Sequence, residues 1–190
     1  MHIGIADHLG WAVAVTATRD HEVVDRQRID LVEPSVRVAP IHHEGGTWAQ
    51  HGSRHVDDAT LAALVTTVRE SATRATRHSL DRLAADLPSC VVSISLRDIT
   101  VNLPDDIAVL RRPPYESRAD AIMYRQVIAD VAGSMGWEVH IYDARTVLTQ
   151  AASLLGTRTD DVLSGPRARW GPPWTKDHRV ALAAAVVAGR

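Results

Sequence analysis

The 190-residue sequence has one cysteine, no phenylalanine and a single lysine among its 21 basic residues. One cysteine cannot form an internal disulfide framework, which excludes the disulfide-stapled secreted scaffolds. Cys90 stands beside Val91 and Val92, which predicts a small buried apolar side chain rather than a nucleophile. The sequence contains no run of about 18 or more uncharged apolar residues and no signal-peptide pattern at its start. We therefore expect a cytoplasmic protein without a membrane partner.

The sequence also lacks an excess of positive or negative charge. The 21 basic and 23 acidic residues give a formal net charge of -2, so no global attraction to nucleic acid is expected. Any nucleic-acid surface must be a local patch. Phosphate-cradling glycine loops, Gly-x-Ser-x-Gly elbows and paired Cys-x-x-Cys motifs are absent, which leaves the corresponding enzyme classes without sequence support.

The first third of the chain predicts a meander of three strands. Apolar runs at 2–6 and 11–17 are separated by a short polar turn that contains glycine, and a second turn precedes a partly alternating run at 22–31. Residues from about 33 to 56 are rich in proline, glycine and histidine and show no periodicity. We expect a long excursion there, since loops of that length are usually functional or disordered.

Helices and strands alternate in the remaining sequence. Apolar residues three and four apart predict helices, and runs rich in β-branched residues predict buried strands. The expected elements are helices at 57–87, 117–135, 143–155, 160–163 and 176–188, and strands at 89–96 and 137–142. The order β-β-β-α-β-α-β-α-α predicts one α/β domain over 1–190, in which a mixed sheet with three antiparallel and then parallel strands has helices on both faces.

Three segments resemble a known superfamily when they are taken with this order of elements. Residues 3–10, Ile-Gly-Ile-Ala-Asp-His-Leu-Gly, are similar to the Gly-Ile-Asp-x-Gly opening of the ribonuclease H-like superfamily, with Ala6 displacing the aspartate by one position. Residues 139–147 resemble the strand and turn that lead into the following helix of the superfamily fold. Residues 177–183 resemble the Asp-x-x-Asp-Ala helix, with Val180 at the second aspartate. Within the superfamily, the Holliday-junction resolvase branch is the most similar.

This resemblance implies metal-assisted hydrolysis of phosphodiesters in structured DNA or RNA. In that chemistry, carboxylates from distant chain positions hold two divalent ions, and hard Mg²⁺ or Mn²⁺ prefers such oxygen ligands. The resemblance makes Asp7, Asp177 and His178 the catalytic candidates. The metal-ligand candidates are Asp7, Asp177, Asp57 and Asp58.

The strand at 89–96 should deliver a further carboxylate near its end. Ser93, Ser95 and Arg97 occupy its alternate positions, and Asp98 is out of phase with them by one residue. The acidic set of the family is therefore incomplete in this sequence.

Each acidic candidate also has a structural explanation. Asp7 fits a turn, in which aspartate bonds its own backbone. Asp177 falls in the first turn of a helix, where the helix dipole stabilises a carboxylate. Asp57, Asp58 and Asp143 fit helix caps.

A proline-stiffened loop combines aromatic rings with cations. Such a combination can stack bases and neutralise phosphates, and tryptophans in such a loop can equally pack over the core or meet a protein partner or second copy. The nucleic-acid-binding candidates are Arg167, Arg169, Trp170, Trp174, Lys176 and Arg179.

Four histidines, His42, His43, His51 and His55, lie in the excursion. Their spacing matches no strong metal signature, which favours a solvated or pH-sensitive loop over a zinc site.

Two functions are consistent with these patterns. The first is a divalent-metal-dependent nuclease-type protein, and the alternative is a catalytically inactive ribonuclease H-like module that binds a protein or nucleic-acid partner. One half of an actin-like fold shares the early meander, but the second half that ATP hydrolysis needs is missing.

Overall fold

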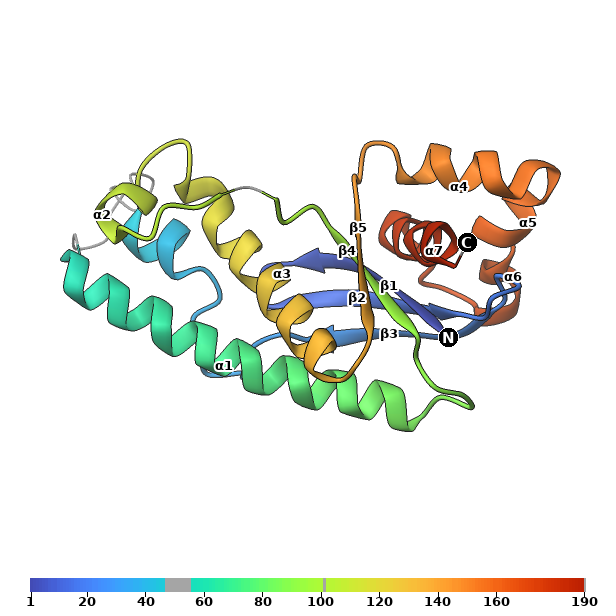
Figure 1. The fold of residues 1–190 in the computed structure, drawn as a ribbon, viewed down its shortest axis with the longest axis horizontal. Coiled ribbons are helices and arrows are strands. Elements are labelled where there is room, and N and C mark those ends of the chain that lie inside the picture. Colours follow the sequence, from blue (N-terminus) through green and yellow to red (C-terminus); the bar gives the residue numbers. More distant parts are fainter. Residues whose placement is uncertain (47–55, 101, 190) are drawn as a thin grey trace.

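The computed structural model describes residues 1–46, 56–100 and 102–189. A five-stranded mixed sheet forms the centre of the fold (Figure 1). Its strands are β1 (His2–His8), β2 (Trp11–Ala17), β3 (Val23–Asp30), β4 (Ser93–Arg97) and β5 (Glu138–Tyr142), in the spatial order β3-β2-β1-β4-β5. Strands β1, β2 and β3 are antiparallel neighbours, whereas β4 and β5 run parallel to β1. The predicted mixed sheet is confirmed.

Helices cover both faces of this sheet. The long helices are α1 (Asp58–Ala85), α3 (Glu116–Ser134), α4 (Val147–Leu155) and α7 (Lys176–Ala188), and the short ones are α2 (Ile107–Leu110), α5 (Thr159–Leu163) and α6 (Pro166–Trp170). Helices α1 and α3 pack together on one face, while α7 packs on β1 and β2 of the other face with α4 against it (Figure 1). None of the helices in the described ranges has the length and apolar character needed to cross a bilayer.

Alternation along β1 divides the core into two layers. Ile3 and Ile5 are buried in the layer that contains α1 and α3, and Ala6 is buried in the layer that contains α7. Gly4 also faces α7, where a Cβ atom would lie 1.7 Å from the carbonyl oxygen of Ala181. Ser95 on β4 donates to the carbonyl oxygen of Ala184 at 3.1 Å, so α7 lies directly on the central strands.

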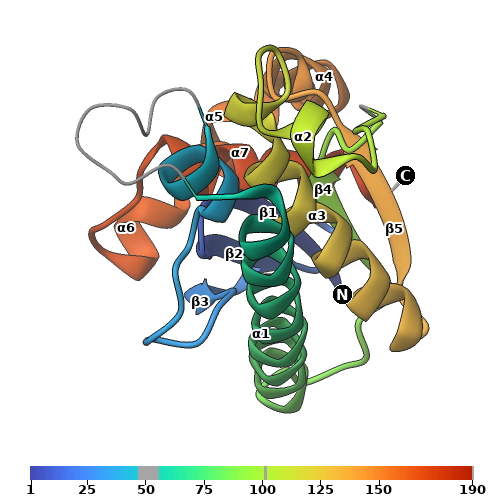
Figure 2. The ribbon, with the colours of Figure 1, turned by 90° about the vertical axis from the view of Figure 1, so that its left-hand side faces the viewer.

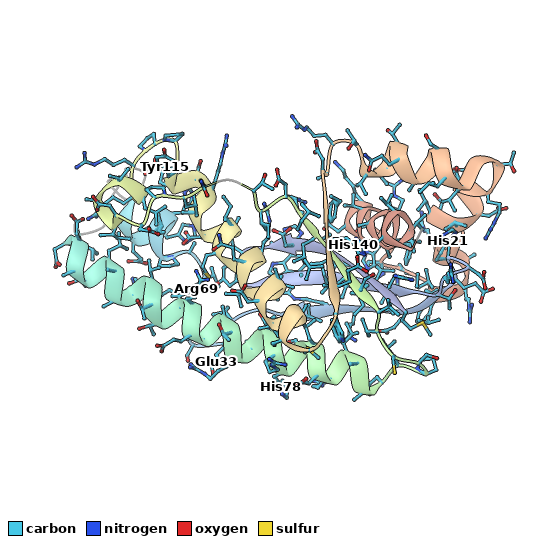
Figure 3. All side chains as sticks on the ribbon, viewed as in Figure 1. His21, Glu33, Arg69, His78, Tyr115 and His140 are labelled. Atoms are coloured by element: carbon cyan, nitrogen blue, oxygen red, sulfur yellow. The ribbon has the colours of Figure 1, made fainter. Side chains whose placement is uncertain are left out.

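The segment after β3 is more ordered than its composition predicts. A π-helical turn (Pro40–Gly45) lies with α2 near the N-terminal end of α1 (Figure 2). The buried Asp120 carboxylate of α3 accepts hydrogen bonds from the backbone N–H groups of Ile41 and His42. These contacts satisfy two backbone donors at the start of the π-helical turn. Glu33, labelled in Figure 3, is tied to α1 by an ion pair with Arg74 at 2.7 Å.

Two sequence-based expectations were wrong. Cys90 is exposed rather than buried, because the strand begins at Ser93 and its pairing with β1 starts there, opposite His2. The helix expected from residue 143 begins at Val147. Asp143 instead closes a turn, in which its side chain accepts the backbone N–H of Arg145 at 2.9 Å.

Candidate functional site

One edge of the sheet gathers most of the chemistry-bearing side chains. The carboxyl ends of the parallel strands β1, β4 and β5 meet at this edge, and the register of the meander adds the start of β2 and the end of β3. Ligand sites of open α/β sheets lie outside the carboxyl ends of the strands. The N-terminus of α7 reaches the same edge, since Asp177 contacts His8 at 3.1 Å.

The one-residue displacement in the β1 motif decides where its carboxylate points. Ala6, which stands at the motif aspartate, faces α7, whereas Asp7 has the phase of Ile3 and Ile5 and points to the opposite face. Asp177 lies on the α7 side. The structure therefore places the two principal acidic candidates on opposite faces of the sheet.

Asp7 is held by two arginines. Its side chain is only 3% exposed, and one carboxylate oxygen accepts from Arg125 Nε at 2.7 Å. The other oxygen lies 3.8 Å from Arg97 Nε, and neither atom of that second pair has a hydrogen-bond partner among the described residues. The two arginines make the surroundings of Asp7 cationic. Burial raises the pKa of the neighbouring Tyr142 to about 12, and the negative charge of Asp7 is a second cause.

Asp57 and Asp58 serve the start of α1. Asp57 accepts the backbone N–H of Thr60 at 2.9 Å as an N-cap, and the Thr60 hydrogen bonds lower the pKa of its carboxyl. Asp58 pairs with Arg111, a buried residue that also donates to the carbonyl oxygens of Gly45 and Val56. The capping explanation accounts for Asp57, and the ion pair with Arg111 accounts for Asp58.

The donor set does not fit a two-ion site. Asp7 is bonded to arginine, Asp177 is bonded to His8 on the other face, and Arg97 ends the strand that should supply a carboxylate. Nowhere in the described ranges do three histidine, cysteine, aspartate or glutamate side chains form a group able to hold a metal ion. A carboxylate neutralised by arginine is a poor ligand, because the cation would have to displace the guanidinium.

His178 has a capping role instead of a position beside Asp7. The Thr175 backbone N–H donates to His178 Nδ1 at 3.2 Å, which forms a capping box at the start of α7. Burial lowers the pKa of His178, and the nearby Arg26 charge lowers it further, against the opposing effect of Asp177. The neutral imidazole is therefore the form that the folded chain favours.

We expect the capping box to make the fold sensitive to mild acid. Because the folded pKa of His178 lies below its ordinary value of 6.5, the contribution is full above that value and is lost as the pH falls through the folded pKa. Protonation also removes the Nδ1 acceptor, and a cap is worth about 1 kcal/mol. Thermal unfolding of the wild type and His178→Gln between about pH 7 and 5 should show the larger loss of Tm in the wild type. Parallel losses in both proteins would contradict this role.

A cavity of about 360 Å³ opens between α3 and the ends of β4 and β5. Arginine dominates its charged lining. Four arginines (Arg97, Arg118, Arg125 and Arg145) and two aspartates (Asp98 and Asp143) face it. Arg145 is 88% exposed and bonded to Asp143, and Arg118 is exposed without a side-chain partner in the described part of the chain. This arrangement suits a phosphate group better than a metal ion.

Most of these arginines were not singled out by the sequence. Arg118 and Arg125 are seven residues apart on α3, a spacing that places both on one helix face and that could have identified them. Arg97 is in phase with Ser93 and Ser95, and the sequence marks it only as a position that lacks the expected carboxylate. Its nearness to Asp7 depends on the pairing of β1 with β4, which a single sequence does not reveal.

The proline-stiffened loop of the sequence is partly helical, because α6 extends to Trp170; the segment 170–174, which we call the tryptophan loop, is braced from β3. Arg26 donates to the carbonyl oxygens of Trp170 at 2.7 Å and Gly171 at 3.0 Å, and the Trp174 indole donates to Leu163 at 2.9 Å. Trp170 and Trp174 both pack against the α7 side of the core. The remaining nucleic-acid candidates, Arg167, Arg169, Lys176 and Arg179, are exposed around this loop.

The histidine cluster is only partly described. The His42 and His43 rings are 5.3 Å apart and tilted by 48°, whereas His51 and His55 lie outside the described residues. The described part is a π-helical turn rather than a solvated loop, and the pH sensitivity of the segment stays a prediction.

Comparisons with known proteins agree with the fold. No family model matches the chain, and no curated protein matches its sequence. Among solved structures, T. thermophilus RuvC in complex with Holliday junction substrate is similar, with a TM-score of 0.52 and 9% identity over 98% of this chain and 90% of that chain. The fold is therefore ribonuclease H-like. Its similarity to a Holliday-junction resolvase confirms the resemblance expected from the sequence, at the level of the fold.

Proposed function

We propose that this protein is a ribonuclease H-like module that binds nucleic acid at the carboxyl edge of its sheet without hydrolysing it. The supporting observation is that arginines occupy this edge where the superfamily has metal-binding carboxylates. Arg125 and Arg97 surround Asp7, and Ala6 stands at the position of the motif aspartate. Arginine forks match phosphate geometry, and phosphate contacts supply most of the affinity for nucleic acid. The superfamily's hydrolysis needs carboxylates that are free to hold cations. At this edge Asp7 is paired with Arg125 and Asp143 with Arg145, and no three ligand side chains gather for a metal ion among the described residues.

The cavity between α3 and the ends of β4 and β5, which we call the Arg-lined cavity, provides the binding surface. Its four arginines and two aspartates make a local cationic patch in a chain whose net charge is -2. Asp7 lies behind Arg125 and lowers this excess further, so the patch is moderate. Structured DNA is the partner class we infer, because the structural neighbour is described in complex with a Holliday junction substrate. A cytoplasmic location and a protein partner or homodimer stay predictions.

Two substitutions test the surface. Arg118→Gln and Arg145→Gln each remove one exposed cation that lines the cavity, so each should weaken binding of a four-way DNA junction. The slope of the logarithm of affinity against the logarithm of salt concentration should fall by about 1 per substitution. Fluorescence anisotropy of a labelled junction across a salt series measures both quantities.

Arg82→Gln is the matched control, because it removes an exposed arginine from the last turn of α1. If all three variants bind with the wild-type affinity and salt slope, the Arg-lined cavity is not the binding surface. An effect of Arg82→Gln as large as the other two would indicate nonspecific attraction spread over the molecule.

A further inference from the structure

Three planar groups from three neighbouring strands stack at the same sheet edge, on the α7 side. The rings of His8 (β1) and Trp11 (β2) are 4.1 Å apart with an interplanar angle of 9°. The guanidinium carbon of Arg28 (β3) lies 4.2 Å from the centroid of the Trp11 ring. The register explains the stack, because His8 is paired with Trp11 and Trp11 with Asp30, two residues beyond Arg28. We call His8, Trp11 and Arg28 the planar ladder.

The planar ladder remains accessible. The side chains of His8 and Arg28 are 40% and 61% exposed. Asp177 fixes His8 through a 3.1 Å contact, and among the described residues the ion pair of Arg28 is a long one, with Asp30 at 3.8 Å. The ladder therefore presents a planar surface together with a cation whose charge is weakly compensated.

A cavity of about 420 Å³ adjoins Trp11 and Arg28. This volume falls within the range of ligand clefts, about 300 to 1,000 Å³. Its far wall includes Pro173, whose carbonyl oxygen accepts from Arg26 and whose loop is thereby braced against β3. Asp177 adds carboxylate oxygens to the lining, which suit the N–H groups on the edges of bases.

From this arrangement we infer that the planar ladder and its cavity form a stacking site for an unpaired base of single-stranded nucleic acid. The inference rests on the proposed function. It adds that the α7 side of the sheet edge binds a base, whereas the cavity beside α3 binds phosphates. Both faces of the Trp11 ring are covered, by His8 and by Arg28, so the base stacks on the outer face of the Arg28 guanidinium, which Trp11 supports from behind. Every base has a π-face, so this stacking tolerates any sequence. The N–H edge of Arg28 at the same time donates to the adjoining phosphate, and Asp177 meets the edge of the base.

The test compares two single strands of about 12 nucleotides, one with thymine bases and one abasic throughout, which keeps the phosphates and removes the bases. Anisotropy of the labelled strands gives both affinities. We expect the wild type to bind the thymine strand about tenfold more tightly than the abasic strand. Trp11→Leu and Arg28→Lys should reduce this ratio to near one, and Arg28→Lys keeps the charge so that the abasic affinity changes little.

Arg82→Lys is the matched control and should keep the wild-type ratio. Circular dichroism of Trp11→Leu shows whether the variant is folded. Arg28→Lys, on an exposed side chain, gives the same comparison without replacing the half-buried tryptophan. A wild-type ratio near one, or a ratio that persists in both ladder variants, would overturn the stacking site while leaving the proposed function intact. Failure of the wild type to bind either strand or a four-way junction would overturn both.

Discussion

Replacing Gly4 by alanine should cost about 4 kcal/mol of folding free energy or more, the largest effect expected of any substitution considered for this chain. The added Cβ would lie 1.7 Å from the Ala181 carbonyl oxygen and 2.6 Å from its carbonyl carbon. Both atoms belong to the backbone of α7, so no rotamer change can relieve the overlap, and β1 and α7 would have to separate. Chemical unfolding followed by circular dichroism, or loss of soluble protein, measures the effect.

Gly133 provides the control for this substitution. It lies near the end of α3, and a Cβ built there meets nothing within 4 Å. Gly133→Ala should therefore stabilise the chain by about 0.5 to 1 kcal/mol, because alanine loses less backbone entropy in a helix. If Gly4→Ala unfolded with a midpoint close to that of the wild type, the direct contact of α7 with β1 would be refuted.

Replacing Asp7 by asparagine should destabilise the chain by about 2 to 3 kcal/mol, because it leaves Arg125 without its buried counter-ion. Asp7 is 3% exposed and Arg125 is 13% exposed, so water replaces the lost partner poorly. A carboxylate used as a metal ligand behaves differently, since active-site acids are often destabilising and their removal often raises stability. Urea unfolding of the two proteins distinguishes the two roles by the sign of the change.

A double-mutant cycle isolates the Asp7 pair. Arg125→Gln should destabilise by a similar amount, and the double variant should lose less than the sum of the two single losses. Asp177→Asn is the matched control, because its partner His8 is exposed and such pairs are worth about 0 to 1 kcal/mol. If Asp7→Asn were as stable as the wild type, Asp7 could not be the buried partner of Arg125.

Periodicity predicted most of the architecture of this chain. The meander, the long helix after residue 57 and the two parallel strands were predicted within a few residues, because apolar spacing sets which face each element buries. The exposure of Cys90 was missed, since the point where a strand starts to pair depends on its neighbour. Asp120 as the anchor of residues 41 and 42 was also beyond prediction, because that contact is tertiary.

The candidate site was predicted less well than the fold. The resemblance of two short segments to the superfamily motifs identified Asp7 and Asp177. The face on which Asp7 lies follows from the strand phase at Ala6, and that of Asp177 from the packing of α7. The arginines around Asp7 come from β4 and α3, which are about 90 and 118 positions away in the chain. The planar ladder depends on the register of three strands. Both features arise from pairing and packing that a single sequence does not specify.

The central claim is tested most directly by incubating the wild-type protein with a labelled four-way DNA junction in Mg²⁺ or Mn²⁺ and measuring binding and cleavage in the same samples. Our account predicts a retarded junction whose strands stay intact on a denaturing gel. Strand cleavage that disappears in Asp177→Asn, with wild-type binding retained, would contradict it and would identify the protein as a nuclease. Absence of any retarded junction would contradict the nucleic-acid-binding function itself.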